Sequence, residues 1–144
     1  MRFTKIAKVT IIISVITTAV TLGAKAEDNT SEFSWSKLMD AISQVESKGN
    51  HRAVNGKSCG IMQITPVLVS DCNNILKSRG VKKRYYLSDR YNVKKSREMF
   101  ELIMSQYNPT NDIEKAIRIW NGGIHYTQKG TQGYYNKVMK VYRA

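Results

Sequence analysis

The sequence predicts a single small domain that is mainly α-helical and has little or no β-sheet. The 144 residues are 42% hydrophobic and include only 9 Gly and 2 Pro, a composition that favours one compact fold over a disordered or collagen-like chain. From residue 35 onward, apolar side chains recur at helical spacing in five segments. Alternating runs joined by a two-residue turn, which would predict a β-hairpin, do not stand out.

The N-terminus predicts a secretory signal peptide over residues 1–26. Three basic side chains precede an apolar run over residues 9–22, and an Ala-Lys-Ala cleavage site ends at Ala26. We expect a polar leader over residues 27–34 and the folded domain over residues 35–144. Loss of the four signal-peptide cations lowers the net charge from +12 to +8, so the exported, periplasmic or secreted chain stays basic. The alternative is an uncleaved signal anchor.

The first predicted helix begins at Trp35, with Ser34 as its expected N-cap and Gly49 just past its C-terminal end. Residues 55–59 are then turn-like, and a short apolar run follows over residues 60–64. The apolar positions of the helix have the spacing of one helical face, and they are Trp35, Leu38, Met39, Ile42 and Val45.

Four further helices are expected downstream. Apolar residues at helical spacing predict them over residues 67–76, 92–107, 112–123 and 134–142. An Asp at the start of the third of these is its expected N-cap, and two Gly end it. The stretch over residues 81–91 is basic and rich in tyrosine.

Glu46 breaks the apolar pattern of the first helix. It follows Ile42 by four residues and Met39 by seven, so it lies on the apolar face instead of the solvated one. Burial there would raise the pKa of the carboxyl, and the negative end of the helix dipole acts in the same direction. A carboxyl that keeps its proton near neutral pH can serve as a general acid. The alternative is that the helix ends at Val45 and Glu46 points into water.

Cys59 and Cys72 are the two cysteines of the chain. In an exported protein an even pair predicts a disulfide, worth about 3 kcal/mol by loop entropy, in preference to a metal site or a nucleophile. Such a bridge would tie residues 60–63 to the following helix and hold one wall of a site in place. The alternative is two free, buried thiols.

Four separated motifs appear in order along the chain: E-S-x-x-N at residues 46–50, G-I-M-Q-I-x-P at 60–66, A-I-R-I-W-N-G-G at 116–123 and T-Q-G-Y-x-x-x-V at 131–138. Together they resemble the motifs of the soluble lytic transglycosylase catalytic domain, which has a goose-type lysozyme-like fold. The resemblance covers nearly all of residues 35–144. It departs from the family pattern at Trp120, where a Tyr is usual.

The resemblance implies that Glu46 is the catalytic acid/base. It implies that Gln63, with Met62, lines the sugar cleft, and that Tyr134 hydrogen-bonds near the catalytic carboxyl. The alternatives are a core role for Met62, a helix-end cap for Asn121 and a merely buried ring for Tyr134. The substrate-binding residues carried over from the motifs are Ser47, Met62, Gln63, Asn121 and Tyr134.

A single carboxylate fits the chemistry that the resemblance implies. Glycoside hydrolysis normally uses two carboxylates, but neither Asp40 nor Asp71 is an evident partner for Glu46. The family cleaves the β-1,4 bond between MurNAc and GlcNAc and forms 1,6-anhydroMurNAc, with no metal or organic cofactor. A lysozyme-like peptidoglycan hydrolase and a non-catalytic peptidoglycan-binding module are the alternatives.

The expected partners are peptidoglycan glycan strands, and the protein is expected to act as a monomer. By family analogy, a single small domain resembles accessory enzymes of envelope-spanning secretion, conjugation or pilus machines. The run Lys82-Lys83-Arg84-Tyr85-Tyr86 raises nucleic-acid or membrane binding as another class. Because a short basic run is usually a solvated face, no nucleic acid is expected as a partner.

Overall fold

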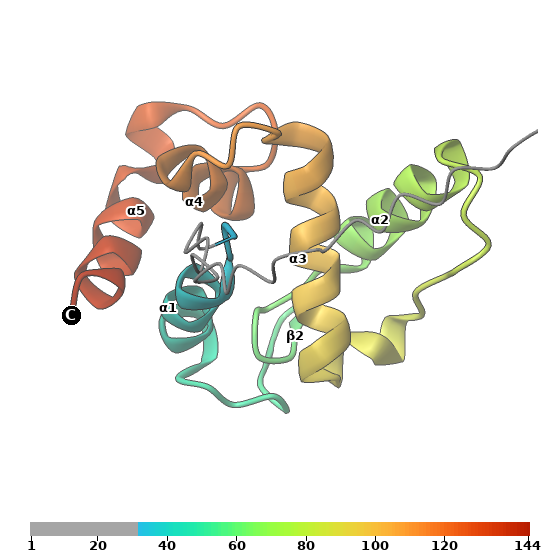
Figure 1. Ribbon diagram of the computed structural model, residues 1–144. Coiled ribbons are helices and arrows are strands. Elements are labelled where there is room, and N and C mark those ends of the chain that lie inside the picture. The colour runs from blue at the N-terminus through green and yellow to red at the C-terminus, as the bar shows by residue number, and fades with distance from the viewer. Residues whose placement is uncertain (1–31) are drawn as a thin grey trace, which may run out of the picture. The chain divides into compact units, whose positions relative to one another are not determined.

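The computed structural model describes residues 32–144 (Figure 1), so the predicted signal peptide and residues 27–31 of the predicted leader lie outside the described residues. Within residues 32–144 no helix is long and apolar enough to cross a bilayer. The mainly α-helical class is confirmed. The elements in chain order are α1 (Ser36–Ser47), β1 (Val54–Asn55), β2 (Ser58–Cys59), α2 (Pro66–Ser78), the 3-10 helix η1 (Leu87–Tyr91), α3 (Val93–Tyr107), α4 (Ile113–Gly122) and α5 (Gln128–Tyr142).

Side-chain caps fix where most of the helices begin. Thr65 Oγ1 accepts the Leu68 N–H at the start of α2 (3.2 Å), and Thr127 Oγ1 accepts the Gly130 N–H at the start of α5 (3.1 Å). Asn92 and Asp112 cap α3 and α4 in the same way. The predicted N-cap of α1, Ser34, is corrected. The N-cap is Trp35, which makes no side-chain cap hydrogen bond.

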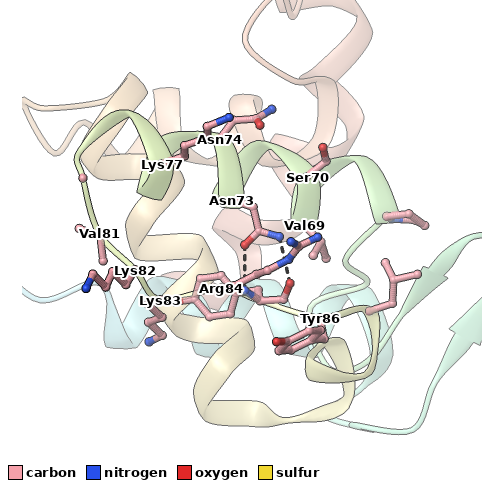
Figure 2. Close-up of a pocket in the computed structure, with 14 residues that line it drawn as sticks. Val69, Ser70, Asn73, Asn74, Lys77, Val81, Lys82, Lys83, Arg84 and Tyr86 are labelled. Carbon is pink, nitrogen blue, oxygen red and sulfur yellow. Dashed lines mark hydrogen bonds between the residues drawn. The ribbon is translucent and has the colours of Figure 1, made fainter.

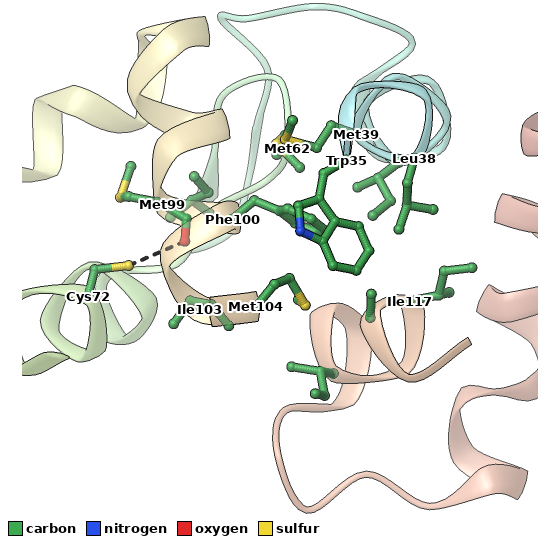
Figure 3. Packing of buried hydrophobic residues seen from close by; sticks show 14 of the residues in the cluster. Trp35, Leu38, Met39, Met62, Cys72, Met99, Phe100, Ile103, Met104 and Ile117 are labelled. Carbon is green, nitrogen blue, oxygen red and sulfur yellow. Dashed lines mark hydrogen bonds between the residues drawn. The ribbon is translucent and has the colours of Figure 1, made fainter. Parts of the chain in front are cut away.

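α3 lies at the centre of the core, with α1, α4 and α5 on one side of it and α2 on the other (Figure 1). The Phe100 ring of α3 packs edge-on against Trp35, with ring centroids 5.6 Å apart, and packs at a tilt against Trp120 of α4, with centroids 5.1 Å apart. Figure 3 shows the contact of Trp35 with Phe100 among the buried side chains of α1, α3 and α4. Such aromatic pairs contribute about 0.5–1.5 kcal/mol each beyond their burial, so they fix α1 and α4 relative to α3.

A short hairpin and a tight loop connect α1 to α2. β1 and β2 pair antiparallel, with Val54 opposite Cys59, and Cys59 also bridges to Ile64. Gly60 has a positive φ of 80°, and a Cβ added there would lie 1.8 Å from the carbonyl oxygen of Arg90. Since only glycine allows this approach, η1 packs directly against the loop of residues 60–64.

The predicted Cys59–Cys72 disulfide is wrong. Both cysteines lie in the described part of the chain, and both are free, buried thiols. The Cys72 thiol points from α2 to the carbonyl oxygen of Met99 on α3, 3.7 Å away (Figure 3), whereas Cys59 Sγ accepts a hydrogen bond of 3.2 Å from the Tyr91 hydroxyl. The two thiols therefore have different neighbours, and packing against α3 and η1, not a covalent bridge, holds the loop.

Candidate active site

Glu46 and Tyr134 form the centre of the candidate site. α1 continues through Ser47, so Glu46 lies within its last turn and the helix does not end at Val45. The carboxyl is half-buried, and its Oε1 accepts a hydrogen bond of 2.7 Å from the Tyr134 hydroxyl on α5. Tyr134 makes no hydrogen bond to the other carboxyl oxygen.

Burial controls the protonation of this pair. Desolvation raises the pKa of Glu46 above its ordinary value, and the hydrogen bond from Tyr134 opposes that rise. Burial, together with the adjacent carboxyl, raises the pKa of Tyr134 far above its ordinary value, so the phenol stays protonated and remains a donor. The arrangement is that of a carboxyl whose protonated form is favoured by burial and whose conjugate base is stabilised by one hydrogen bond.

The loop of residues 60–64 is fastened to the end of α1 beside Glu46. Ser47 Oγ donates to the carbonyl oxygen of Ile61 (2.7 Å). Gln63, which has a positive φ of 52°, donates from Nε2 to the carbonyl oxygens of Gly60 (2.9 Å) and Ala53 (3.3 Å). Both side chains are thus engaged within the protein: Ser47 ties the loop to the end of α1, and Gln63 closes the loop on itself and on Ala53.

The structure separates the remaining substrate-binding assignments. Met62 is fully buried in the core, and its carbonyl oxygen accepts a hydrogen bond of 3.3 Å from Trp120 Nε1. The assignment of the Met62 side chain to a cleft wall is therefore corrected to the core alternative. Asn121, by contrast, is exposed on the last turn of α4.

Arg118 is a buried cation of α4 that the sequence analysis missed. Its side chain is buried and reaches from α4 to α5, where it donates to Thr131 Oγ1 (2.9 Å), Gln132 Oε1 (2.9 Å) and the Gln128 carbonyl (3.0 Å). The guanidinium also lies 4.6 Å from the Tyr135 ring centroid. These contacts tie α4 to the first turns of α5, the helix that carries Tyr134. The available signal was a basic residue inside the apolar run A-I-R-I-W.

The two other acids considered as partners of Glu46 lie elsewhere. Asp40 forms an ion pair with Arg97 of α3. Asp71 lies exposed on α2, where it contributes to raising the pKa of Cys72. Among residues 32–144 no group of three or more His, Cys, Asp or Glu side chains could hold a metal ion. Glu46 is accordingly paired with a phenol and not with a second carboxylate.

The fold and this pair define a helical domain with one half-buried carboxyl at a helix end. In a comparison with protein families, the model described as the transglycosylase SLT domain matches residues 24–142. The chain therefore belongs to the transglycosylase SLT family, which supports a lytic-transglycosylase-like function that acts on peptidoglycan. Comparisons with curated proteins and with solved structures give no significant match.

Proposed function

We propose that the protein is an exported lytic transglycosylase that cleaves the MurNAc–GlcNAc β-1,4 bond of peptidoglycan with formation of 1,6-anhydroMurNAc. The observation that carries this proposal is the Glu46–Tyr134 pair. One carboxyl with a raised pKa has a phenol as its hydrogen-bonding partner, and no acidic group contributes to the shift of its pKa. A mechanism that needs a single carboxylate suits this arrangement better than one that needs two.

In the proposed reaction, protonated Glu46 donates its proton to the glycosidic oxygen as the bond from that oxygen to C1 of MurNAc breaks. The carboxylate that results then accepts the proton of the MurNAc 6-hydroxyl as O6 forms a bond to C1. Glu46 ends in its protonated state, and no water is consumed. The Tyr134 hydroxyl holds Oε1 throughout, which orients the carboxyl and stabilises its ionised form between the two proton transfers.

Product analysis on purified sacculi tests this proposal. The wild-type protein should release muropeptides with anhydroMurNAc ends, detected by mass spectrometry, and Glu46→Gln should release none. The Glu46→Gln protein should still bind sacculi, because the amide keeps the shape of the side chain. Ordinary reducing MurNAc ends from the wild-type protein would assign it to the lysozyme-like hydrolases, and binding without any product would assign it to the non-catalytic modules.

Export is a separate part of the proposal and rests on the three-part pattern of residues 1–26. A mature form that begins at Glu27, found by N-terminal sequencing of the periplasmic fraction, is the expected result. A small, locally acting enzyme also suits an envelope-spanning secretion or pilus machine, which needs a gap in the wall. Loss of machine assembly in a strain that carries only Glu46→Gln would support that role, and normal assembly would exclude it.

A further inference from the structure

A groove of about 610 Å³ lies between α2 and the segment of residues 80–87 (Figure 2). Neither Glu46 nor Tyr134 lines it. α2 packs on the side of α3 that faces away from α1 and α5 (Figure 1). This surface, which we call the α2 groove, is therefore separate from the candidate active site.

The charges that line the α2 groove are all positive. Lys77 of α2 and the run over residues 82–84 contribute four cations, and no Asp or Glu is among the lining residues. Lys83 is neutralised by Glu98 of α3, with Nζ to Oε2 at 2.6 Å. Within the described residues no ion pair involves the other three cations, which are exposed: Lys77, Lys82 and Arg84. An anionic ligand is thus favoured.

The segment of residues 80–87, which forms one wall of the α2 groove, is held in place by hydrogen bonds to α2. Asn73 of α2 makes two hydrogen bonds to the backbone of Tyr85, from Nδ2 to the carbonyl oxygen (2.9 Å) and from the Tyr85 N–H to Oδ1 (2.8 Å), drawn as dashed lines in Figure 2. The Tyr85 ring is buried beneath this point and its hydroxyl lies 3.3 Å from Glu98. The segment is therefore fixed against α2 and α3 before any ligand arrives.

The ligand-facing chemistry of the groove suits a peptide. Residues 81–86 belong to no helix or strand, Tyr86 has an extended backbone conformation, and within the described residues the backbone N–H and C=O groups of residues 82–84 make no hydrogen bond. A backbone segment with open hydrogen-bonding groups can pair with a second chain. Val81 and Tyr86 add exposed apolar surface, 44% and 62% exposed. A polyphosphate would use the charges of the groove and leave its apolar and amide groups unused.

We propose that the α2 groove binds the acidic stem peptides of peptidoglycan and acts as a second wall-binding site within the catalytic domain. This inference rests on the proposed function, because that function brings the peptides to the protein. Stem peptides combine free carboxylates with small apolar side chains and a peptide backbone, the three features that the groove can receive. When the α2 groove holds a stem peptide, the effective concentration of glycan strand at Glu46 rises, and the reverse also holds.

The test uses a free acidic stem tetrapeptide and its carboxamide analogue as probes, with binding measured by calorimetry. The wild-type protein should bind the acidic peptide and bind the carboxamide more weakly. Replacing Lys77, Lys82 and Arg84 with Gln should lower the affinity for the acidic peptide by about tenfold or more, because charge-assisted hydrogen bonds are lost. A matched control replaces the exposed Lys129, Lys137 and Lys140 of α5, which removes the same charge, and should bind as the wild type does.

Cleavage assays separate this inference from the proposed function. On glycan strands stripped of peptides by an amidase, the groove variant should match the wild type, whereas on intact sacculi at limiting protein concentration it should be slower. A wild-type protein that cleaves no substrate would overturn the proposed function. The groove assignment fails if the variant binds the acidic peptide as well as the wild type does. It also fails if both triple variants lose affinity equally, or if duplex DNA binds the groove as tightly as the peptide, since each result would reflect net charge alone.

Discussion

The Tyr134 hydroxyl and the Glu46 carboxyl meet at 2.7 Å although the two residues are 88 positions apart in the chain. The contact depends on α5 packing against both α1 and α4, so it forms only when the domain is folded. It gives the half-buried carboxyl a donor that stays protonated, because the pKa of Tyr134 is raised far above its ordinary value.

Removal of this donor should change the pH profile. Because the hydrogen bond lowers the pKa of Glu46, Tyr134→Phe should raise that pKa further. Activity that needs the protonated acid is lost as pH rises through the pKa, so the alkaline limb of kcat should move to higher pH. The rate at the optimum should fall about 10- to 100-fold, the worth of one charge-assisted hydrogen bond. Tyr135→Phe, on the same helix, keeps its ring over Arg118 and serves as the control. If the alkaline limb of kcat stays in place in Tyr134→Phe, Tyr134 is not the donor that tunes the pKa of Glu46.

Arg118 should matter for both stability and rate. Arg118→Met leaves several acceptors on α5 without a donor and should cost about 3 kcal/mol of unfolding free energy, measured in denaturant. If the network positions Tyr134, kcat should fall while KM changes little. Arg118→Lys should restore only part of both, because lysine lacks the fork of donors. Arg79→Met, which removes an exposed guanidinium, should change neither. An unchanged kcat in a destabilised Arg118→Met protein would limit the role of Arg118 to stability.

Gly60 and Gly49 offer a matched pair for the loop beside the site. Both have a φ near +80°, but a Cβ at Gly49 meets no atom within 4 Å, whereas one at Gly60 meets the Arg90 carbonyl oxygen at 1.8 Å. Gly49→Ala should therefore cost only the left-handed strain of about 1–2 kcal/mol. Gly60→Ala should cost clearly more and should lower activity, because the loop that carries Gln63 must move. Equal losses of thermal stability in the two variants would contradict this packing.

Thiol chemistry tests the correction to the cysteine prediction. A denatured but unreduced protein should show two reactive thiols, and a reducing agent should leave its melting temperature unchanged. In the native state Cys72 should react very slowly, because burial raises the pKa of its thiol to about 12 and the neighbouring Asp71 adds to that rise. The absence of free thiols after denaturation would show that the bridge forms after all.

The sequence predicted helices correctly where the apolar spacing is regular. It missed helical turns that are held by tertiary contacts and not marked by apolar residues. The apolar face that includes Met39 and Ile42 predicted both the helix α1 and the position of Glu46 on that face. α5 begins at Gln128, not at Tyr134 as predicted. Its first turns are polar and contain two glycines, so they carry no apolar signal, and the buried Arg118 holds them from α4.

The sequence motifs predicted which segments contribute to the candidate site, but not where each side chain in those segments points. Nothing in the pattern of residues 60–66 distinguishes Met62, whose side chain enters the core, from Gln63, whose side chain closes the loop. The cysteine pairing followed from the expected compartment and not from geometry. It failed because one thiol faces α3 and the other η1.

Digestion of sacculi in heavy-oxygen water shows whether water or the MurNAc 6-hydroxyl attacks C1. New MurNAc ends made by the wild-type protein should be anhydro ends without heavy oxygen, and Glu46→Gln should make no new ends. Reducing ends that carry heavy oxygen would show that water is the nucleophile and would contradict the single-carboxyl mechanism.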